Sequence, residues 1–104
     1  MQPAVRHHAR TGLAFTELGL GTAPLANLYR AVPDGEADAI MEAAWEGGVR
    51  HFDTAPLYGF GLAETRLNRF LRGRPRESYV LATKVGRLLR AVPRGQGDGA
   101  GKWF

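Results

Sequence analysis

The order of hydrophobic and polar positions predicts alternating strands and helices along the chain. Residues 5–16 are expected to form a hairpin that turns at Thr11 and Gly12, because glycine readily adopts the positive φ angle of a tight turn. A short strand at 18–22 follows, and its glycines permit a close approach of the backbone where the strand ends. The hairpin should therefore lead into the first strand of the main sheet.

Two later segments have apolar residues at helical spacing. The first helix should begin at Asp34, a residue type favoured as an N-cap, and end at the glycine pair 47–48. The second should cover 62–72 and stop at the glycine and proline within 73–75. The expected buried stripes are Ala37, Ile40, Met41, Ala44 and Trp45 in the first helix, and Ala63, Leu67, Phe70 and Leu71 in the second.

Two further strands, at 49–54 and 79–85, complete the pattern. The second is a nearly continuous run of apolar and β-branched residues, which is typical of a strand covered on both faces. Residues 86–104 are rich in arginine, glycine and proline, and we expect a loop there. The order hairpin, strand, helix, strand, helix, strand, loop predicts an α/β fold with a parallel sheet and right-handed crossovers over 18–85.

The composition restricts the protein further. A length of 104 residues suits one small domain. Cysteine is absent, which excludes disulfides and thiolate metal ligands and agrees with a reducing, cytoplasmic location. No stretch approaches the roughly 20 apolar residues that span a bilayer, and no signal peptide is recognisable. We therefore expect neither a membrane contact nor a metal site.

The chain is basic, with a net charge of +4 at pH 7, which would suit a nucleic-acid partner. The arginines are scattered, however, and Arg66, Arg69 and Arg72 fall near one flank of the second helix, where we expect them to face solvent. Charge is the only feature in favour of nucleic-acid binding, so no such partner is expected.

Polar residues and glycines gather where the predicted strands end, at Gly21 and Thr22, at Asp53 and at Lys84. In parallel α/β folds these carboxyl ends share one edge, where ligands bind. A phenol, with a pKa of about 10, is a poor acid unless an ammonium stabilises its phenolate, and a carboxylate keeps such an ammonium charged. Lysine, unlike arginine, can also have its pKa lowered by burial. Each residue alone is readily explained by capping or packing, but Asp53, Tyr58 and Lys84 together indicate proton transfer to a carbonyl oxygen as hydride reaches the carbon.

The sequences GVRHFDTAPLYG at 48–59, ATKVG at 82–86 and GTAPL at 21–25 resemble the aldo-keto reductases. The similarity is greatest to the branch that contains D-threo-aldose 1-dehydrogenase, L-fucose dehydrogenase and pyridoxal 4-dehydrogenase, and it runs from about residue 10 to at least residue 90. This resemblance implies the N-terminal portion of a (β/α)8 TIM barrel with a hairpin across its bottom. The chain would then be a partial barrel over 1–104, with about three of the eight strands.

The resemblance also implies roles for individual residues. Asp53, Tyr58 and Lys84 would be three of four catalytic residues, with Tyr58 as the proton donor or acceptor. Gly21 and Thr22 would lie against the nicotinamide end of NADP or NAD, and Asp53 and Lys84 would complete the cofactor contacts. The substrate would be a small carbonyl compound or sugar. The resemblance determines neither the identity of this substrate nor the choice between NADP and NAD.

The fourth catalytic residue of that family is a histidine on the fourth strand, which would lie past Phe104. His51 is two residues before Asp53 on one strand, so it should share that face one layer deeper, as a packed interior side chain. Without the remaining strands, the polypeptide 1–104 is expected to be inactive. The alternative is a reductase-like barrel without catalysis that senses cofactor or binds a partner; retention of Asp53, Tyr58 and Lys84 argues against it.

Overall fold

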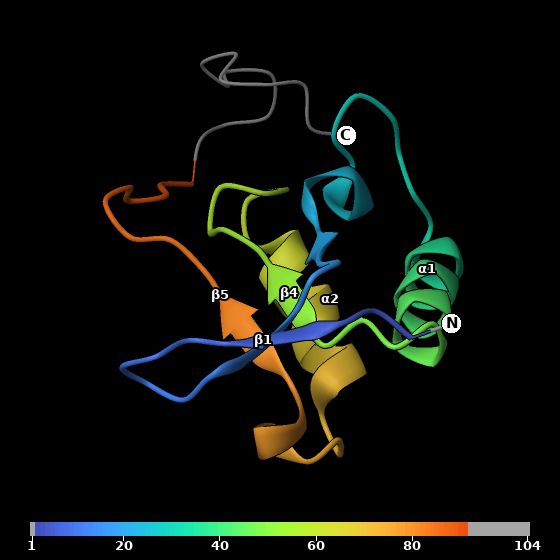
Figure 1. The fold of residues 1–104 in the computed structure, drawn as a ribbon. Helices are drawn as coiled ribbons and strands as arrows, with labels where there is room; N and C mark the ends of the chain where they lie inside the picture. Colours follow the sequence, from blue (N-terminus) through green and yellow to red (C-terminus); the bar gives the residue numbers. More distant parts are fainter. Residues whose placement is uncertain (1, 92–104) are drawn as a thin grey trace.

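A three-stranded parallel sheet in the order β3-β4-β5 lies at the centre of the computed structural model, which describes residues 2–91 (Figure 1). Helix α1 connects β3 to β4, and α2 connects β4 to β5, so the predicted alternation of strands and helices is confirmed. The predicted loop at 86–104 lies outside the described residues from 92 onward. The elements of this unit are β3 (Leu20–Gly21), α1 (Asp34–Glu46), β4 (His51–Asp53), α2 (Leu62–Leu71) and β5 (Val80–Ala82).

Each strand is shorter than the run of β-forming residues that predicted it. Strands β3, β4 and β5 are paired in register over Leu20, Phe52 and Leu81, and over the residue that follows each of them. Outside this paired region, backbone groups form hydrogen bonds with segments other than the neighbouring strand. The Val49 amide, for example, donates to the Ala44 carbonyl at 2.9 Å and so belongs to the exit of α1. The sequence marks where the chain is extended, whereas pairing with a neighbour decides where a strand begins.

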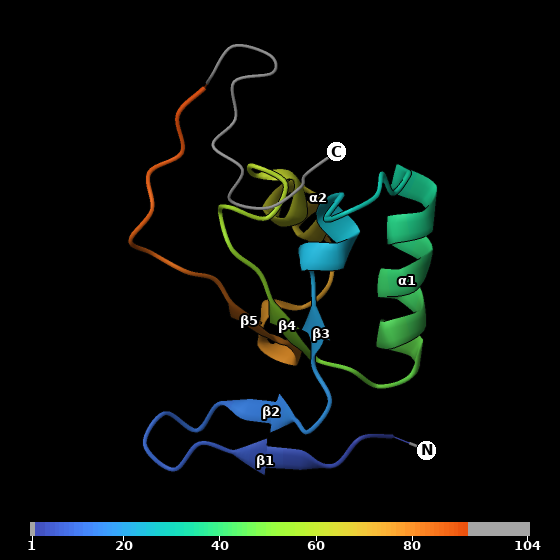
Figure 2. The same ribbon diagram turned by 90° about the horizontal axis from the view of Figure 1, so that it is seen from above.

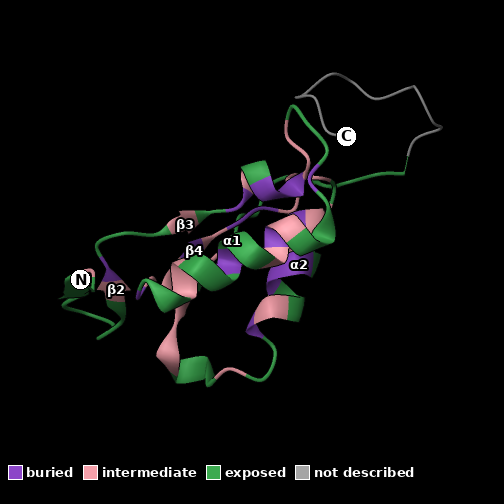
Figure 3. Ribbon diagram, turned by 90° about the vertical axis from the view of Figure 1, so that its right-hand side faces the viewer, coloured by how far each residue is buried: buried purple, intermediate pink, exposed green. Residues whose placement is uncertain are grey.

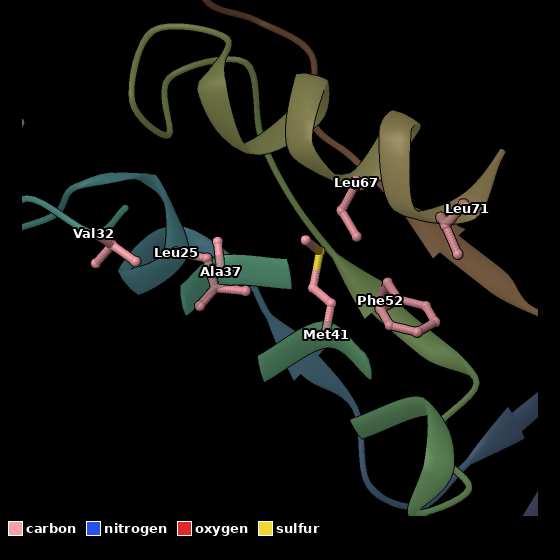
Figure 4. Close-up of a cluster of buried hydrophobic side chains, with 7 residues drawn as sticks. All are labelled: Leu25, Val32, Ala37, Met41, Phe52, Leu67 and Leu71. Atoms are coloured by element: carbon pink, nitrogen blue, oxygen red, sulfur yellow. The ribbon is translucent and has the colours of Figure 1, made fainter. Parts of the chain in front are cut away.

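Both helices cover the same face of the sheet. Phe52 at the centre of β4 is fully buried, and it packs against Met41 of α1 and Leu67 of α2 (Figure 4). The predicted stripe of α2 is confirmed, and so is most of that of α1. Ile40 is the exception, since 37% of its surface is exposed.

The start of α1 differs from the predicted one. Pro33 occupies the N-cap position, and Asp34 is the first residue of the helix without a side-chain cap. The carboxylate of Asp34 instead accepts a hydrogen bond from Nε of Arg66 at 3.0 Å. The expectation that Arg66 faces solvent is also wrong, since only 5% of its surface is exposed. The two errors have one cause, a contact between α1 and α2 that neither local pattern reveals.

A separate two-stranded antiparallel sheet lies across the end of the parallel strands from which they start (Figure 2). The Arg50 amide, just before β4, donates to Oγ1 of Thr16 at 3.1 Å, and the rings of Phe15 and His51 meet edge to face at 5.1 Å. The ligand-binding edge of the parallel sheet is therefore at the opposite end. This hairpin consists of β1 (Val5–His7) and β2 (Ala14–Thr16).

The hairpin turn is wider than predicted. Gly12 has the expected positive φ, at 72°, but the strands are joined by the whole segment 8–13 rather than by a tight turn at Thr11 and Gly12. The side chains of His8 and Thr11 contact each other at 2.9 Å, and the His8 amide donates to the Leu13 carbonyl. These local bonds replace the strand pairing expected at 8–10.

Arginine side chains pack on an aromatic cluster near the start of β4. Trp45 is stacked on Phe52, with ring centroids 6.2 Å apart, and the guanidinium carbons of Arg50 and Arg74 lie 3.7 and 4.7 Å from the centre of the Trp45 ring. Such cation–π contacts hold cations against apolar surface. Arg50 and Arg74 therefore direct part of the positive charge of the chain toward its own aromatic rings.

One side of the sheet remains open among the described residues. An apolar groove of about 370 Å³ lies between α2 and β5, beside the 3-10 helix η2 (Arg76–Ser78), and Leu67, Tyr79 and Leu81 line it. Strand β5 has no partner on its outer edge within residues 2–91. Figure 3 shows how burial is concentrated on the surfaces that α1, α2 and the sheet turn toward one another.

We predict that a polypeptide of residues 1–104 alone is marginally stable and self-associates. The open edge of β5 and the groove beside it leave apolar surface and unpaired backbone groups in water. Ordering each residue costs roughly 1–2 kcal/mol in conformational entropy, which so small a core barely offsets. Sedimentation velocity and thermal melting should show oligomers or a broad transition; a monomer with a sharp cooperative melt would contradict this prediction.

Candidate active site

The carboxylate of Asp53 and the amine of Lys84 meet at the carboxyl ends of β4 and β5. Nζ of Lys84 donates to Oδ2 of Asp53 at 3.1 Å and to the carbonyl oxygen of Thr54 at 3.0 Å. Asp53 ends β4 and is in register with Ala82, and Lys84 comes two residues later, so both face the same side of the sheet. Parallel pairing of the two strands therefore brings together residues 31 apart in sequence.

Tyr58 reaches this pair from the loop between β4 and α2. The loop folds back on itself, because the three residues after Tyr58 all have positive φ: Gly59 at 65°, Phe60 at 53° and Gly61 at 96°. Two glycines make most of this path accessible at little cost. The Tyr58 ring centre lies 5.0 Å from Nζ of Lys84. The structure thus brings together all three residues that the sequence pattern selected.

Contacts with Tyr58 and Asp53 raise the pKa of the Lys84 ammonium above its ordinary value. The hydrogen bond with Tyr58 is the largest cause and the hydrogen bond with Asp53 the second, and they outweigh the opposing effect of burial. Lys84 therefore stays charged at neutral pH. The sequence also permitted a lysine whose pKa is lowered by burial, and among the described residues the shift has the opposite direction.

Gly21 and Thr22 lie at the same end of the sheet. Gly21 is in register with Asp53, and a Cβ atom added to it would have no neighbour within 4 Å, so the backbone there is open to approach. Thr22 is 1% exposed. Its amide and its hydroxyl both donate to the Asp53 carbonyl, at 3.1 and 2.9 Å, and so fix the end of β4.

His51 lies one layer below Asp53 on the same face of β4, as predicted. It is half-buried against Phe15 of the hairpin. A Cβ atom on Gly19 would come within 3.0 Å of its Nδ1, so the glycine makes room for the imidazole. The ring is packed between the two sheets and does not reach Tyr58 or Lys84 by any described contact.

Sequence reasoning missed two side chains of α2 that support the site. Oε2 of Glu64 accepts a hydrogen bond from Oγ1 of Thr83 at 2.9 Å, next to Lys84. Arg66 is buried among loop carbonyls. A signal for Arg66 was present, because Ala63, Arg66, Leu67 and Phe70 follow helical spacing and put the arginine within the apolar stripe. Glu64 had no such signal.

A pocket of about 220 Å³ adjoins Tyr58 and Lys84. Its apolar walls come from Pro56, Leu57 and Val85. Arg87 adds a second cation beside Lys84, and sequence reasoning did not identify it. The pocket therefore combines apolar surface with positive charge and a phenol at one end.

Two other properties apply to residues 2–91. No group of three or more potential metal-ligating side chains lies together there. None of the helices in that range has both the length and the apolar character that crossing a bilayer requires.

A carboxylate, a phenol and an ammonium at the carboxyl ends of parallel strands define an α/β protein with the elements of a proton-transfer site. Comparison with known proteins agrees with that class. The model of the Aldo/keto reductase family matches residues 17–103. The chain therefore belongs to the aldo/keto reductase family of oxidoreductases.

Individual relatives point to one part of this family. D-threo-aldose 1-dehydrogenase from a Pseudomonas species is 52% identical over 91 residues, which are 88% of this chain and 28% of that protein. Pyridoxal 4-dehydrogenase from Microbacterium luteolum is 55% identical over 80 residues, 77% of this chain and 23% of that protein. The chain thus spans less than a third of the length of these curated relatives.

The fold has a solved counterpart. The aldo-keto reductase AKR11C1 from Bacillus halodurans superimposes with a TM-score of 0.74 and 32% identity, over 98% of this chain and 30% of that chain. The described residues are accordingly the N-terminal part of a (β/α)8 barrel, with the hairpin at its bottom. This confirms the predicted fold class.

We predict that the pKa of Lys84 lies above 10.5, its ordinary value. Tyr58→Phe and Asp53→Asn should each lower it, because each removes a hydrogen bond that favours the charged amine. A raised pKa means that these contacts stabilise the fold below pH 10.5 and that this stabilisation is lost as the pH rises through the native pKa. Titration of the Lys84 side chain by NMR measures the value, and one at or below 10.5 in the unmodified protein would contradict the prediction.

Proposed function

We propose that the complete protein containing this chain is an NAD(P)-dependent oxidoreductase that interconverts a small aldose, aldehyde or ketone with its oxidised or reduced partner. The observation that carries the proposal is the contact of Lys84 with both Asp53 and Tyr58. The names of the similar dehydrogenases, which concern an aldose and pyridoxal, agree with a small carbonyl or sugar substrate.

In this mechanism Tyr58 exchanges a proton with the substrate oxygen. When bound, the nicotinamide supplies or accepts the hydride at the substrate carbon. In the reducing direction the Tyr58 hydroxyl donates its proton to the carbonyl oxygen and becomes a phenolate; in the oxidising direction the phenolate takes the proton back. The Lys84 ammonium stabilises that phenolate, and Asp53 keeps the ammonium charged and oriented.

The proposed cofactor contacts are Gly21, Thr22, Asp53 and Lys84, with NADP or NAD as the cofactor. Gly21 suits this role because a planar ring can approach backbone that no side chain covers. Thr22 supports it indirectly, since its hydrogen bonds to the Asp53 carbonyl hold the strand end in place. The two cations beside the pocket, Lys84 and Arg87, fit a negatively charged dinucleotide.

The pocket beside Tyr58 is the proposed substrate site. It is small, and its apolar walls lie next to the phenol and two cations, which suits a compact molecule with a carbonyl group and hydroxyls. A fourth catalytic residue, a histidine past Phe104, and a cytoplasmic location complete the proposal. The polypeptide 1–104 alone is expected to lack dehydrogenase activity, because the described strands leave the site open on one side.

We predict that Tyr58→Phe removes most turnover of the complete protein and largely spares cofactor binding. The phenyl ring keeps its shape but has no proton to transfer, and general acid–base catalysis typically contributes about 10²–10⁴-fold. Steady-state kinetics measures kcat, and fluorescence titration with NADPH and NADH measures cofactor affinity. Near-normal kcat in the variant would show that Tyr58 does not have this role. If the unmodified complete protein bound cofactor but turned over no substrate, the non-catalytic alternative would be favoured.

The second prediction concerns Lys84. Lys84→Met should lower kcat to a similar degree and move the alkaline limb of its pH profile upward, because the charge that stabilises the phenolate is gone. Lys84→Arg keeps the charge but changes its shape and donor geometry, so it should also lose most activity. Full activity of the arginine variant would show that charge alone suffices and that placement does not matter.

A further inference from the structure

Arg66 is a buried cation that the proposed chemistry does not use directly. It projects from the second turn of α2, and its guanidinium donates to the Leu25 carbonyl, to the Val32 carbonyl at 2.7 Å and to Oδ1 of Asp34 at 3.0 Å. Arginine remains protonated inside proteins, so this site holds a permanent charge. The three acceptors bind three different nitrogens of the guanidinium, whereas the three donors of a lysine ammonium all lie on one atom and cannot reach acceptors so far apart.

These acceptors define the two ends of one loop. Leu25 lies in the 3-10 helix η1 (Ala23–Ala26), directly after Thr22, and Val32 lies just before α1. Between them Asn27 and Tyr29 have positive φ angles of 68° and 66°; asparagine tolerates this conformation, whereas it is unfavourable for the bulky tyrosine. Two contacts close this loop: the Val32 amide donates to Oδ1 of Asn27 at 2.8 Å, and Arg66 joins the Leu25 and Val32 carbonyls.

The loop packs directly against the segment that carries Tyr58. A Cβ atom on Gly59 would lie 2.6 Å from the Ala26 carbonyl oxygen and 2.9 Å from the Ala26 Cβ, so η1 and the residue after Tyr58 leave no room for a side chain between them. Figure 2 shows η1 beside the loop that follows β4 and next to α2. A shift of η1 by a few tenths of an ångström would thus move the backbone at Tyr58.

We infer that Arg66 is a positioning residue for the reaction, one that sets the place of Tyr58 relative to Lys84 through η1 and Gly59. This inference rests on the proposed function. The Tyr58 hydroxyl must reach the substrate oxygen while it stays hydrogen-bonded to Lys84. Misplacement of such a reacting group by about 1 Å can lower the rate roughly 10²-fold. Burial of the guanidinium makes the support rigid, because every alternative arrangement would leave a buried charge or carbonyl without a partner.

The first test compares Arg66→Lys with Leu71→Ala in the complete protein. Lysine keeps the charge but cannot serve both carbonyls and Asp34, so kcat should fall about 10- to 100-fold, with cofactor affinity changed by less than about twofold. Leu71 is equally buried on the same helix, but its side chain is apolar and forms no hydrogen bond to η1 or the loop, so its alanine variant should lower the melting temperature and keep kcat. Equal kcat in the two variants, measured below both melting temperatures, would overturn the inference.

The second test needs no activity. Hydrogen exchange should show faster exchange of the amides of Phe60 and Gly61 in Arg66→Lys than in Leu71→Ala, since those amides bond within the Tyr58 loop. Unchanged protection of these amides would overturn the inference. If the protein turns over no carbonyl or sugar substrate, the proposed function fails, and the exchange result still decides whether Arg66 holds the Tyr58 loop.

A double-mutant cycle tests the route through Gly59. Gly59→Ala forces a methyl group against Ala26 and should lower kcat by itself. If Arg66 acts through the same contact, the loss in the double variant should be clearly smaller than the product of the two single losses. A loss equal to that product would mean that the two residues act independently and would overturn the proposed route.

Discussion

The alternation of side chains along β4 is the constraint on which the rest of the structure depends. Phe52 points toward the helices and is the centre of the core, while His51 and Asp53 point to the other face. A slip of the strand by one residue would bury a carboxylate among apolar side chains and expose the largest core residue. Core packing and site geometry are thus fixed by the same register, and neither can change alone.

The sequence was sufficient for the order of elements and for the grouping of Asp53 with Lys84, because both follow from which segments form strands and helices. The stripes of α1 and α2 follow helical spacing, and parallel strands place Asp53 and Lys84 at one edge whatever the details of the loops. It was insufficient where a residue's partner lies far along the chain. Asp34 was expected to cap its own helix, and it binds Arg66 of the other helix instead.

The ends of the strands illustrate the same limit. β-forming residues at 79–85 predicted a long strand, but only Val80–Ala82 find a partner within the described residues. Propensity describes what one segment prefers, whereas a strand is a property of two segments. Arg66 shows the same limit. The charge of an arginine predicts exposure, but Arg66 is buried because its guanidinium donates hydrogen bonds to carbonyls of a distant loop.

The charged pair Lys84 and Asp53 is exposed among the described residues. The side chains of Lys84 and Asp53 are 51% and 47% exposed among these residues, so water screens their attraction. Two opposite unit charges about 4 Å apart attract by about 1 kcal/mol in water and by about 4 kcal/mol at an effective dielectric constant of about 20. An ammonium that stabilises a phenolate through charge therefore becomes effective only where water is displaced. In the proposed mechanism, the first strands would supply the reacting groups and their positions, and closure of the barrel over them would supply the low dielectric in which those positions matter.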